Sequence, residues 1–404
     1  MVNFLMNMKK MKALKLAVAG ALLAIVGCKT DELKPVEKDG TAPGSIKIST
    51  IEALSGAAKI TYSLPGDPDL LYVQAKYKTR TGGTYEFKSS YYNNSIMVEG
   101  FADTLDYDVE LRAVDKSGNE STPVIAKIKA KTPPVVNTYE SLKVVADFGG
   151  VVISFKNAAK ADLTIIVSTP DSLGKMAIAR KFYTKRDTAS FSLRGYTAEP
   201  RVFKIQVVDK WKNVSTEFSG EYTPMYEVLL DKSKYREMIL PGDSPTNSWG
   251  GKMQNVWDGL VLPDVENCCL HTGNAATGVP KFITFDLGVL VQLSRFSQQT
   301  VADDKHWYND VSLKRYEIWG SESPDPSGSF DSWTKLATVT NAKPSGLPVG
   351  FLTDDDRAAG RAGDEVSFTP DIPKVRYIRI RCLENWSGNT NMVISEVTFW
   401  GNDK

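Results

Sequence analysis

Apolar and polar residues alternate along most of the chain. Residues 71–77 run LYVQAKY and residues 107–113 run YDVELRA, so apolar side chains occupy every second position. This period of two is typical of β-strands that bury one face. Runs with helical spacing of apolar residues are nearly absent. The pattern therefore predicts an all-β protein.

Two stretches of the chain repeat each other. Residues 113–122 (AVDKSGNEST) recur as residues 207–216 (VVDKWKNVST). The distance along the chain between the two copies is close to the length of one small β-sandwich domain, which is about 100 residues. We therefore predict two sandwich domains, at residues 41–132 and 133–224.

The segment after the repeats, residues 225–404, is too long to be a third copy. Its apolar runs also have the character of strands, as in ITFDLG at residues 283–288 and RYIRI at residues 376–380. We predict one further β domain of a different kind.

Charge and composition exclude several classes of protein. The 404 residues include 49 basic and 48 acidic side chains, so the basic excess of a nucleic-acid-binding protein is missing. His271 and His306 are the two histidines, which excludes a three-histidine zinc site and an HExxH protease. The sequence also contains neither a G-x-S-x-G motif nor a P-loop. We therefore expect a protein that is not an enzyme.

The first residues have the pattern of an export signal. Four lysines precede an apolar run at residues 16–26, about half the length that a membrane span needs. The run ends in Gly27 and Cys28, and this end resembles the bacterial lipobox. The resemblance implies a signal peptide at residues 1–27, a lipid on the Cys28 thiol and an anchor in the outer membrane. The polar residues 28–40 then form a flexible tether.

The first repeat resembles fibronectin type III domains. The stretch LDYDVELRAVD at residues 105–115, followed by a turn at residues 117–119, matches a late strand of that family. The second repeat is a degenerate version, in which Phe203 stands nearest the family's tyrosine. The resemblance implies β-sandwiches that mostly serve as spacers.

The C-terminal segment resembles the discoidin family, also called coagulation-factor type C domains. Five stretches match in the right order: VWDG at 256–259, ITFDLG at 283–288, RYEIWGS at 315–321, RYIRI at 376–380 and SEVTFWG at 395–401. The resemblance implies a discoidin-type β-sandwich, or jelly roll, whose loops at one end bind ligand. Bacterial members are often carbohydrate-binding modules.

Two loops of this segment combine aromatic and polar side chains, as sugar sites do. The candidate ligand-binding residues are His306, Trp307, Tyr308 and Asn309 in one loop and Glu384, Asn385 and Trp386 in the other. The family resemblance places both loops at the binding end of the domain. Core packing is the alternative for the two tryptophans. A third stretch, Asn247-Ser248-Trp249, has the same combination of aromatic and polar side chains.

The family also implies one structural calcium ion. Its ligands would include Asp258 in the early Asp-Gly turn and Glu396 in the last strand, because hard oxygen donors suit Ca²⁺. The alternative is that Asp258 caps a turn and Glu396 is a surface strand residue.

Three cysteines lie beyond the leader. Cys268 and Cys269 are adjacent, and Cys382 lies far along the chain. An exported chain permits disulfides, and a bridge from Cys382 to either of the others would leave one odd thiol. The connectivity stays open.

The whole arrangement resembles lipoproteins of polysaccharide-utilisation systems. We expect a non-catalytic lipoprotein, displayed at the cell surface, that binds a polysaccharide or oligosaccharide for a neighbouring importer complex. The alternatives are an adhesion or assembly subunit that binds a protein partner, and a hydrolase whose carboxylate pair is invisible in sequence.

Overall fold

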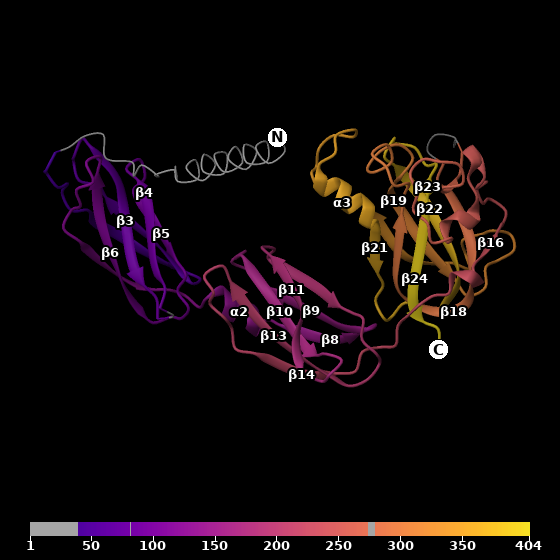
Figure 1. Ribbon diagram of the computed structural model, residues 1–404, viewed down its shortest axis with the longest axis horizontal. Coiled ribbons are helices and arrows are strands. Elements are labelled where there is room, and N and C mark those ends of the chain that lie inside the picture. Colours follow the sequence, from indigo (N-terminus) through magenta and orange to yellow (C-terminus); the bar gives the residue numbers. More distant parts are fainter. Residues whose placement is uncertain (1–38, 81, 274–278) are drawn as a thin grey trace, which may run out of the picture. The chain divides into compact units, whose positions relative to one another are not determined.

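The computed structural model describes residues 39–80, 82–273 and 279–404, and almost all of their regular structure is β-strand (Figure 1). The all-β prediction is confirmed. The predicted signal peptide, Cys28 and nearly all of the tether lie outside the described residues. The chain forms two compact units, one ending at Pro134 and one beginning at Val135. Within the described residues no helix is long and apolar enough to cross a membrane.

The first unit is a sandwich of a three-stranded and a four-stranded antiparallel sheet. The smaller sheet has the order β1-β2-β5, with β1 (Lys47–Leu54), β2 (Ala57–Ser63) and β5 (Ser95–Glu99). The larger sheet has the order β4-β3-β6-β7, with β3 (Leu70–Lys78), β4 (Thr84–Ser90), β6 (Asp106–Asp115) and β7 (Val124–Lys129). Alternate side chains of both sheets form one buried core.

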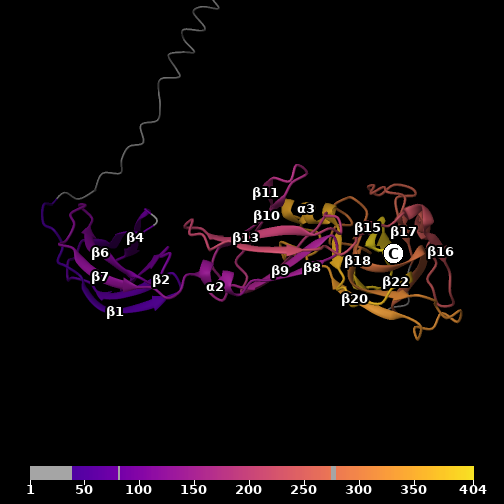
Figure 2. The ribbon, with the colours of Figure 1, turned by 90° about the horizontal axis from the view of Figure 1, so that it is seen from below.

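The second unit begins with a sandwich of the same design. A short helix α2 (Pro134–Glu140) precedes a sheet of order β12-β9-β8, with β8 (Lys143–Asp147), β9 (Gly150–Lys156) and β12 (Thr188–Leu193). The other sheet has the order β11-β10-β13-β14, with β10 (Leu163–Pro170), β11 (Met176–Thr184), β13 (Arg201–Asp209) and β14 (Phe218–Tyr222). Figure 2 shows β13 and β9 in separate layers.

The repeated sequence makes the same contacts in both sandwiches. The hydroxyl of Ser121 accepts the backbone N–H of Ala113 at 3.0 Å, and Ser215 accepts that of Val207 at 3.0 Å. Gly56 and Gly149 both have a φ of 62°, a left-handed conformation that suits glycine in the tight β1–β2 and β8–β9 turns.

The two copies differ at one corner. Tyr107 donates its hydroxyl to Asp103 at 3.0 Å in the first sandwich. In the second, Phe203 is fully buried and has no hydroxyl to donate.

The rest of the second unit is a larger β domain. Its main sheet has the order β15-β24-β18-β22-β19-β20, with β16 and β21 also paired to β18. The strands are β15 (Val228–Leu229), β16 (Arg236–Met238), β17 (Leu270–His271), β18 (Lys281–Gln299), β19 (Leu313–Ser321), β20 (Thr334–Thr340), β21 (Asp364–Ser367), β22 (Val375–Asn385), β23 (Val393–Ile394) and β24 (Glu396–Asn402). Helix α3 (Asp354–Ala362) and 3₁₀ turns at Lys232–Lys234, Ser248–Gly250 and Met253–Val256 complete it.

One long strand connects the two walls of this domain. The first half of β18 pairs with β16 and β22, and its second half pairs with β24 and β21. The pairing changes near Gly288, whose φ of 72° bends the strand. β15 pairs with the far end of β24, at Val228↔Gly401.

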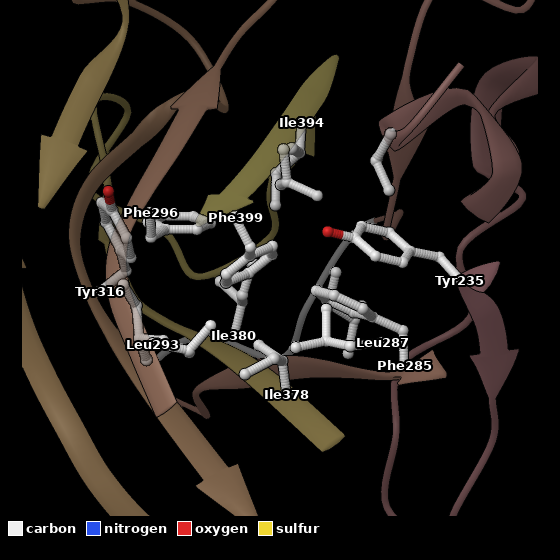
Figure 3. Close-up of a cluster of buried hydrophobic side chains, with 14 of the residues drawn as sticks. Tyr235, Phe285, Leu287, Leu293, Phe296, Tyr316, Ile378, Ile380, Ile394 and Phe399 are labelled. Atoms are coloured by element: carbon white, nitrogen blue, oxygen red, sulfur yellow. The ribbon is translucent and has the colours of Figure 1, made fainter. Parts of the chain in front are cut away.

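Large aromatic side chains fill the space between the walls. The ring of Phe399 lies 4.9 Å from that of Phe296 and 6.0 Å from that of Phe285, and Tyr235 meets it edge-on at 6.3 Å (Figure 3). All four are nearly inaccessible to solvent. This tightly packed core leaves the loops at its end as the place for a ligand.

Candidate functional site

A pocket lies among the loops at one end of the C-terminal domain. Its lining comes from three loop segments and the start of β23: Trp249, Gly250, Gly251, Asp264, Val265, Asn267, Cys268, Cys269, His271, Val301, His306 and Val393. The cavity volume is only about 50 Å³, so a larger ligand would rest mainly on the rim.

Backbone pairing holds these loops together. β17 pairs with β23 at His271↔Val393, and isolated bridges join Asn247 to His271 and Ser312 to Val393. The amide of Asn255 also donates to the carbonyl of Cys269 at 3.0 Å. The pocket walls are therefore fixed by the fold rather than by ligand.

Trp249 is the exposed aromatic side chain of the pocket. Its relative accessibility is 78%, and its contact with the ring of His271 is edge-on at 6.2 Å. Its φ of 56° is left-handed, which is uncommon for a bulky residue and costs of order 1–3 kcal/mol. A large aromatic that is both exposed and strained contributes little to packing, so its position points to a ligand.

Strained backbone gathers around this pocket. In the described residues, six non-glycine residues have positive φ, and four of them lie in these loops: Trp249, Asn267, Tyr308 and Asp310. Such conformations persist where the surrounding structure fixes them, and they concentrate at functional sites.

His271 has a defined protonation state. Its Nδ1 accepts the backbone N–H of Gly273 at 3.0 Å, so the proton of the neutral ring lies on Nε2. Burial lowers the pKa of His271 below the usual 6.5, and the nearby His306 lowers it further, against an opposing effect of Asp310. At neutral pH this imidazole is therefore an uncharged group with one N–H to donate.

His306 is held by carboxylates. Its Nδ1 lies 2.8 Å from Asp303 Oδ1, and its Nε2 lies 4.0 Å from Asp310 Oδ2. Asp264 adds a further exposed carboxylate, which is 4.0 Å from the ammonium of Lys305. Among the lining residues, the Asp264 carboxylate is thus an exposed hydrogen-bond acceptor beside the aromatic face of Trp249.

The predicted loop at residues 306–309 is mainly buried. Trp307 is 6% exposed and its ring packs on Gly360 of α3, with the guanidinium of Arg361 5.4 Å above it. Tyr308 is also buried, Asn309 is half-buried, and only His306 reaches the Trp249 pocket. The prediction that Trp307 is an exposed binding plate is therefore wrong, because α3 covers its ring. The alternative of core packing holds for Trp307.

The second predicted loop meets the first. Trp386 and Tyr308 pack edge-on at 5.5 Å, and the backbone N–H of Ser387 donates to Asp310. Trp386 is half-buried, and Glu384 pairs with Lys314 at 2.5 Å.

Asn385 in the same loop has a structural role. It is fully buried, and its amide donates to Asn391 and accepts the backbone N–H groups of Ser387 and Asn389. The prediction that Asn385 binds ligand is therefore wrong, because both ends of its side chain are already hydrogen-bonded.

The residues predicted for calcium lie close together but do not fit the ion. One oxygen of Glu396 pairs with the ammonium of Lys232, and the other accepts the backbone N–H of Gly259 at 2.8 Å. Asp258 is exposed and accepts the N–H of Leu260 at 2.8 Å. Ca²⁺ needs six to eight oxygen ligands, and here a lysine already supplies the positive charge.

A different acidic cluster lies in the first sandwich. Asp39, Asp69 and Asp115 have carboxylate oxygens within 4.8 Å of one another, the single such group in the part of the chain that the structure describes. Asp115 is already bonded to Asn119 through a backbone N–H at 2.8 Å and a side-chain amide at 2.9 Å. The cluster therefore stabilises a turn.

The sequence indicated Trp249 and His306 as ligand candidates, but it did not indicate Asp264, Asn267 and His271. The signal for Trp249 was an aromatic side chain beside the polar Asn247 and Ser248, which is the composition of a sugar site. Asp264, Asn267 and His271 carry no comparable signal, because only the pairing of β17 with β23 brings them to the pocket.

Family comparisons divide the chain into three segments. Models described as domains of unknown function match residues 43–130 (DUF4959), 131–233 (DUF5126) and 257–401 (DUF5000). No curated protein matches the chain.

Several solved structures are similar to parts of this chain. The SusE-like protein BT2857 is 50% identical, with a TM-score of 0.42, and the match covers 43% of this chain and 100% of that chain. The GH31 module CBM32-2 bound to GalNAc is 14% identical, with a TM-score of 0.29, over 41% of this chain and 95% of that chain. A segment of two fibronectin type III domains from chicken tenascin is 14% identical, with a TM-score of 0.21, over 45% and 99%. Since half of the residues are identical over the full length of the first of these, the chain belongs to the SusE-like family.

Proposed function

We propose that this chain is a non-catalytic, lipid-anchored protein of the outer-membrane surface that binds glycan through the Trp249 pocket. The observation that carries the proposal is Trp249 itself, an indole 78% exposed and fixed in a left-handed conformation beside a neutral histidine. Membership of the SusE-like family and the likeness to polysaccharide-utilisation lipoproteins support the same assignment. A neighbouring importer is the proposed recipient of the glycan.

The chemistry of the pocket suits a sugar ring. A pyranose presents an apolar C–H face that stacks on an indole, and hydroxyl groups at its edge that both donate and accept. His271 Nε2–H can donate to such hydroxyls, and the exposed Asp264 carboxylate and Asn267 amide can accept from them. A shallow site of this kind binds in the range of about −4 to −8 kcal/mol, roughly millimolar to micromolar.

The test is retention of the full chain on a panel of immobilised polysaccharides. Trp249→Ala should weaken retention by about tenfold or more, a loss of ~1.4 kcal/mol or more, and should leave the melting temperature nearly unchanged. Phe351→Ala is the matched control, since Phe351 is also an exposed aromatic of this domain (65%) but does not line the pocket, and it should bind normally.

Trp307→Ala separates binding from folding. Trp307 is buried, so this change should cost about 3–5 kcal/mol of unfolding free energy, measured by denaturant titration.

Wild-type retention by Trp249→Ala would overturn the proposed site. Release of soluble sugar from a bound polysaccharide would overturn the non-catalytic part of the proposal.

A further inference from the structure

Two adjacent cysteines form part of the wall of the Trp249 pocket. The Sγ atoms of Cys268 and Cys269 lie 3.4 Å apart, and the Cys268 thiol donates to its neighbour. Cys382 belongs to a different cluster of the core, where its sulfur faces the carbonyl of Asn391 at 3.9 Å. The pair at residues 268–269 is therefore separate from Cys382.

The backbone holds the two sulfurs together. Successive side chains of a regular strand point to opposite faces, but here the chain turns at Asn267, whose φ is 61°. Ser395 donates its hydroxyl to the Cys268 carbonyl at 2.6 Å, and the Lys252 N–H donates to the Cys269 carbonyl at 3.1 Å. Hydrogen bonds from other segments of the chain thus hold both carbonyls, and the two thiols lie side by side.

We propose that Cys268 and Cys269 are a reversible dithiol–disulfide pair, and that forming the disulfide changes the wall of the Trp249 pocket. An S–S bond is about 2.05 Å long, so the two sulfurs need to approach by ~1.4 Å. Adjacent Cα atoms are only about 3.8 Å apart, which is shorter than an unstrained disulfide spans. A strained disulfide is readily reduced, which is the property of regulatory rather than structural bridges.

The reaction balances with an external disulfide as oxidant, either a small molecule or another protein. Cys269 is less buried than Cys268, so its thiolate attacks first, which forms a mixed disulfide and releases one external thiol. Cys268 then loses its proton and displaces the second external thiol. Two protein thiols are oxidised to one disulfide, and one external disulfide is reduced to two thiols.

The reduced pair is stable until such an oxidant arrives. Burial raises the pKa of the Cys269 thiol, and its hydrogen bond with Cys268 raises it further. The thiolate, which is the reactive form, is therefore scarce at neutral pH.

Mass spectrometry can test the pair directly. The full chain carrying Cys28→Ser is reduced, treated with oxidised glutathione, unfolded, alkylated with iodoacetamide and digested with trypsin. Cleavage after Lys252 and Lys281 places both cysteines in peptide 253–281, while Cys382 falls in peptide 382–404. We expect peptide 253–281 to be unalkylated and lighter than its reduced form by two hydrogen atoms, and peptide 382–404 to be alkylated.

Three controls define the outcome. Cys382→Ser should leave the result unchanged, and Cys269→Ser should abolish it. Treatment with a phosphine should restore two alkylatable thiols in peptide 253–281. Alkylation of both cysteines after oxidation, or a crosslink between peptides 253–281 and 382–404, would overturn the proposal.

The effect on the pocket is measured separately. The fluorescence of Trp249, taken as the difference between wild type and Trp249→Phe, should change between the reduced and oxidised proteins, because a disulfide quenches a nearby indole. An unchanged signal would overturn the link to the pocket. A several-fold change in polysaccharide affinity between the reduced and oxidised proteins is also expected, and this expectation rests on the proposed function. Absence of any polysaccharide binding would refute the proposed function. The mass and fluorescence results would still decide whether the redox pair exists.

Discussion

Single residues of the same type have opposite roles in this domain. Trp249 and Trp307 both stand in polar, loop-like sequence, yet one is 78% exposed and the other 6%. The difference comes from α3, which packs on Trp307 through Gly360. The sequence predicts that tryptophans lie at this end of the domain, but which of them faces solvent depends on a tertiary contact that local sequence does not contain.

Lys232 is expected to make the C-terminal domain independent of calcium. Its ammonium pairs with Glu396, which is 4% exposed, so a chelator should leave the melting temperature of the wild-type chain unchanged. Lys232→Met should lower stability by about 1–3 kcal/mol, because it leaves a buried carboxylate without its cation. A fall in melting temperature on adding chelator to the wild type would show that the ion binds after all.

The neutral state of His271 predicts a pH dependence. Its pKa in the folded protein lies below the ordinary 6.5, so the unfolded chain binds its proton first as the pH falls. Stability therefore decreases as the pH falls through about 6.5, since the unfolded state then holds more protons. His271→Asn should show a shallower loss of melting temperature between pH 7 and pH 5 than the wild type. Parallel curves for the two proteins would refute the assignment.

At the scale of elements, strands were predictable and α3 was not. The three consecutive aspartates 354–356 carry no apolar pattern, but the structure has a helix there. Thr353 and Asp356 form a capping box at its start, and the acidic first turn suits the positive end of the helix. The helix is short and has few apolar residues, so periodicity gives no sign of it.

Gly360 should be required where α3 meets Trp307. Alanine in place of glycine normally stabilises a helix by up to about 1 kcal/mol. Here a Cβ would lie 2.5 Å from Cγ of Trp307, a position near the backbone that cannot swing away. The clash should outweigh the helix preference, so Gly360→Ala should lower the unfolding free energy. Ala358→Gly, an exposed site of the same helix, serves as the comparison and should cost only about 1 kcal/mol.

A gain in stability for Gly360→Ala, measured by denaturant titration, would contradict the close contact. In that case Trp307 would have to be free to move away from α3, and its burial would need another explanation.

At the scale of the whole molecule, the repeat was the most informative signal. Matching turns at residues 113–122 and 207–216 reflect matching hydrogen bonds, such as those of Ser121 and Ser215. The exact division of the chain into domains stays a prediction. The pocket could not be predicted as a unit, because its residues come together only through the pairing of distant strands such as β17 and β23.

The predicted lipid anchor would depend on Cys28, which lies outside the described residues. Cys28→Ala removes the thiol that would carry the lipid, so the variant should appear in the soluble fraction rather than with the outer membrane. Fractionation of both proteins under high-salt wash, followed by immunoblotting, measures this. Continued membrane association of the variant would refute the predicted lipid anchor.

The pairing of β15 with β24 determines how the C-terminal domain would carry a mechanical load. The chain enters at Val228, which pairs with Gly401, whereas the other end of β24 adjoins Ser395, which is bonded to Cys268 in the pocket wall. A pull between a bound ligand and the preceding chain would therefore run along the strands. Hydrogen bonds of an antiparallel pair lie perpendicular to that direction, so they would be loaded together in shear rather than peeled one by one. The glycan-binding protein proposed above would therefore resist drag on its ligand.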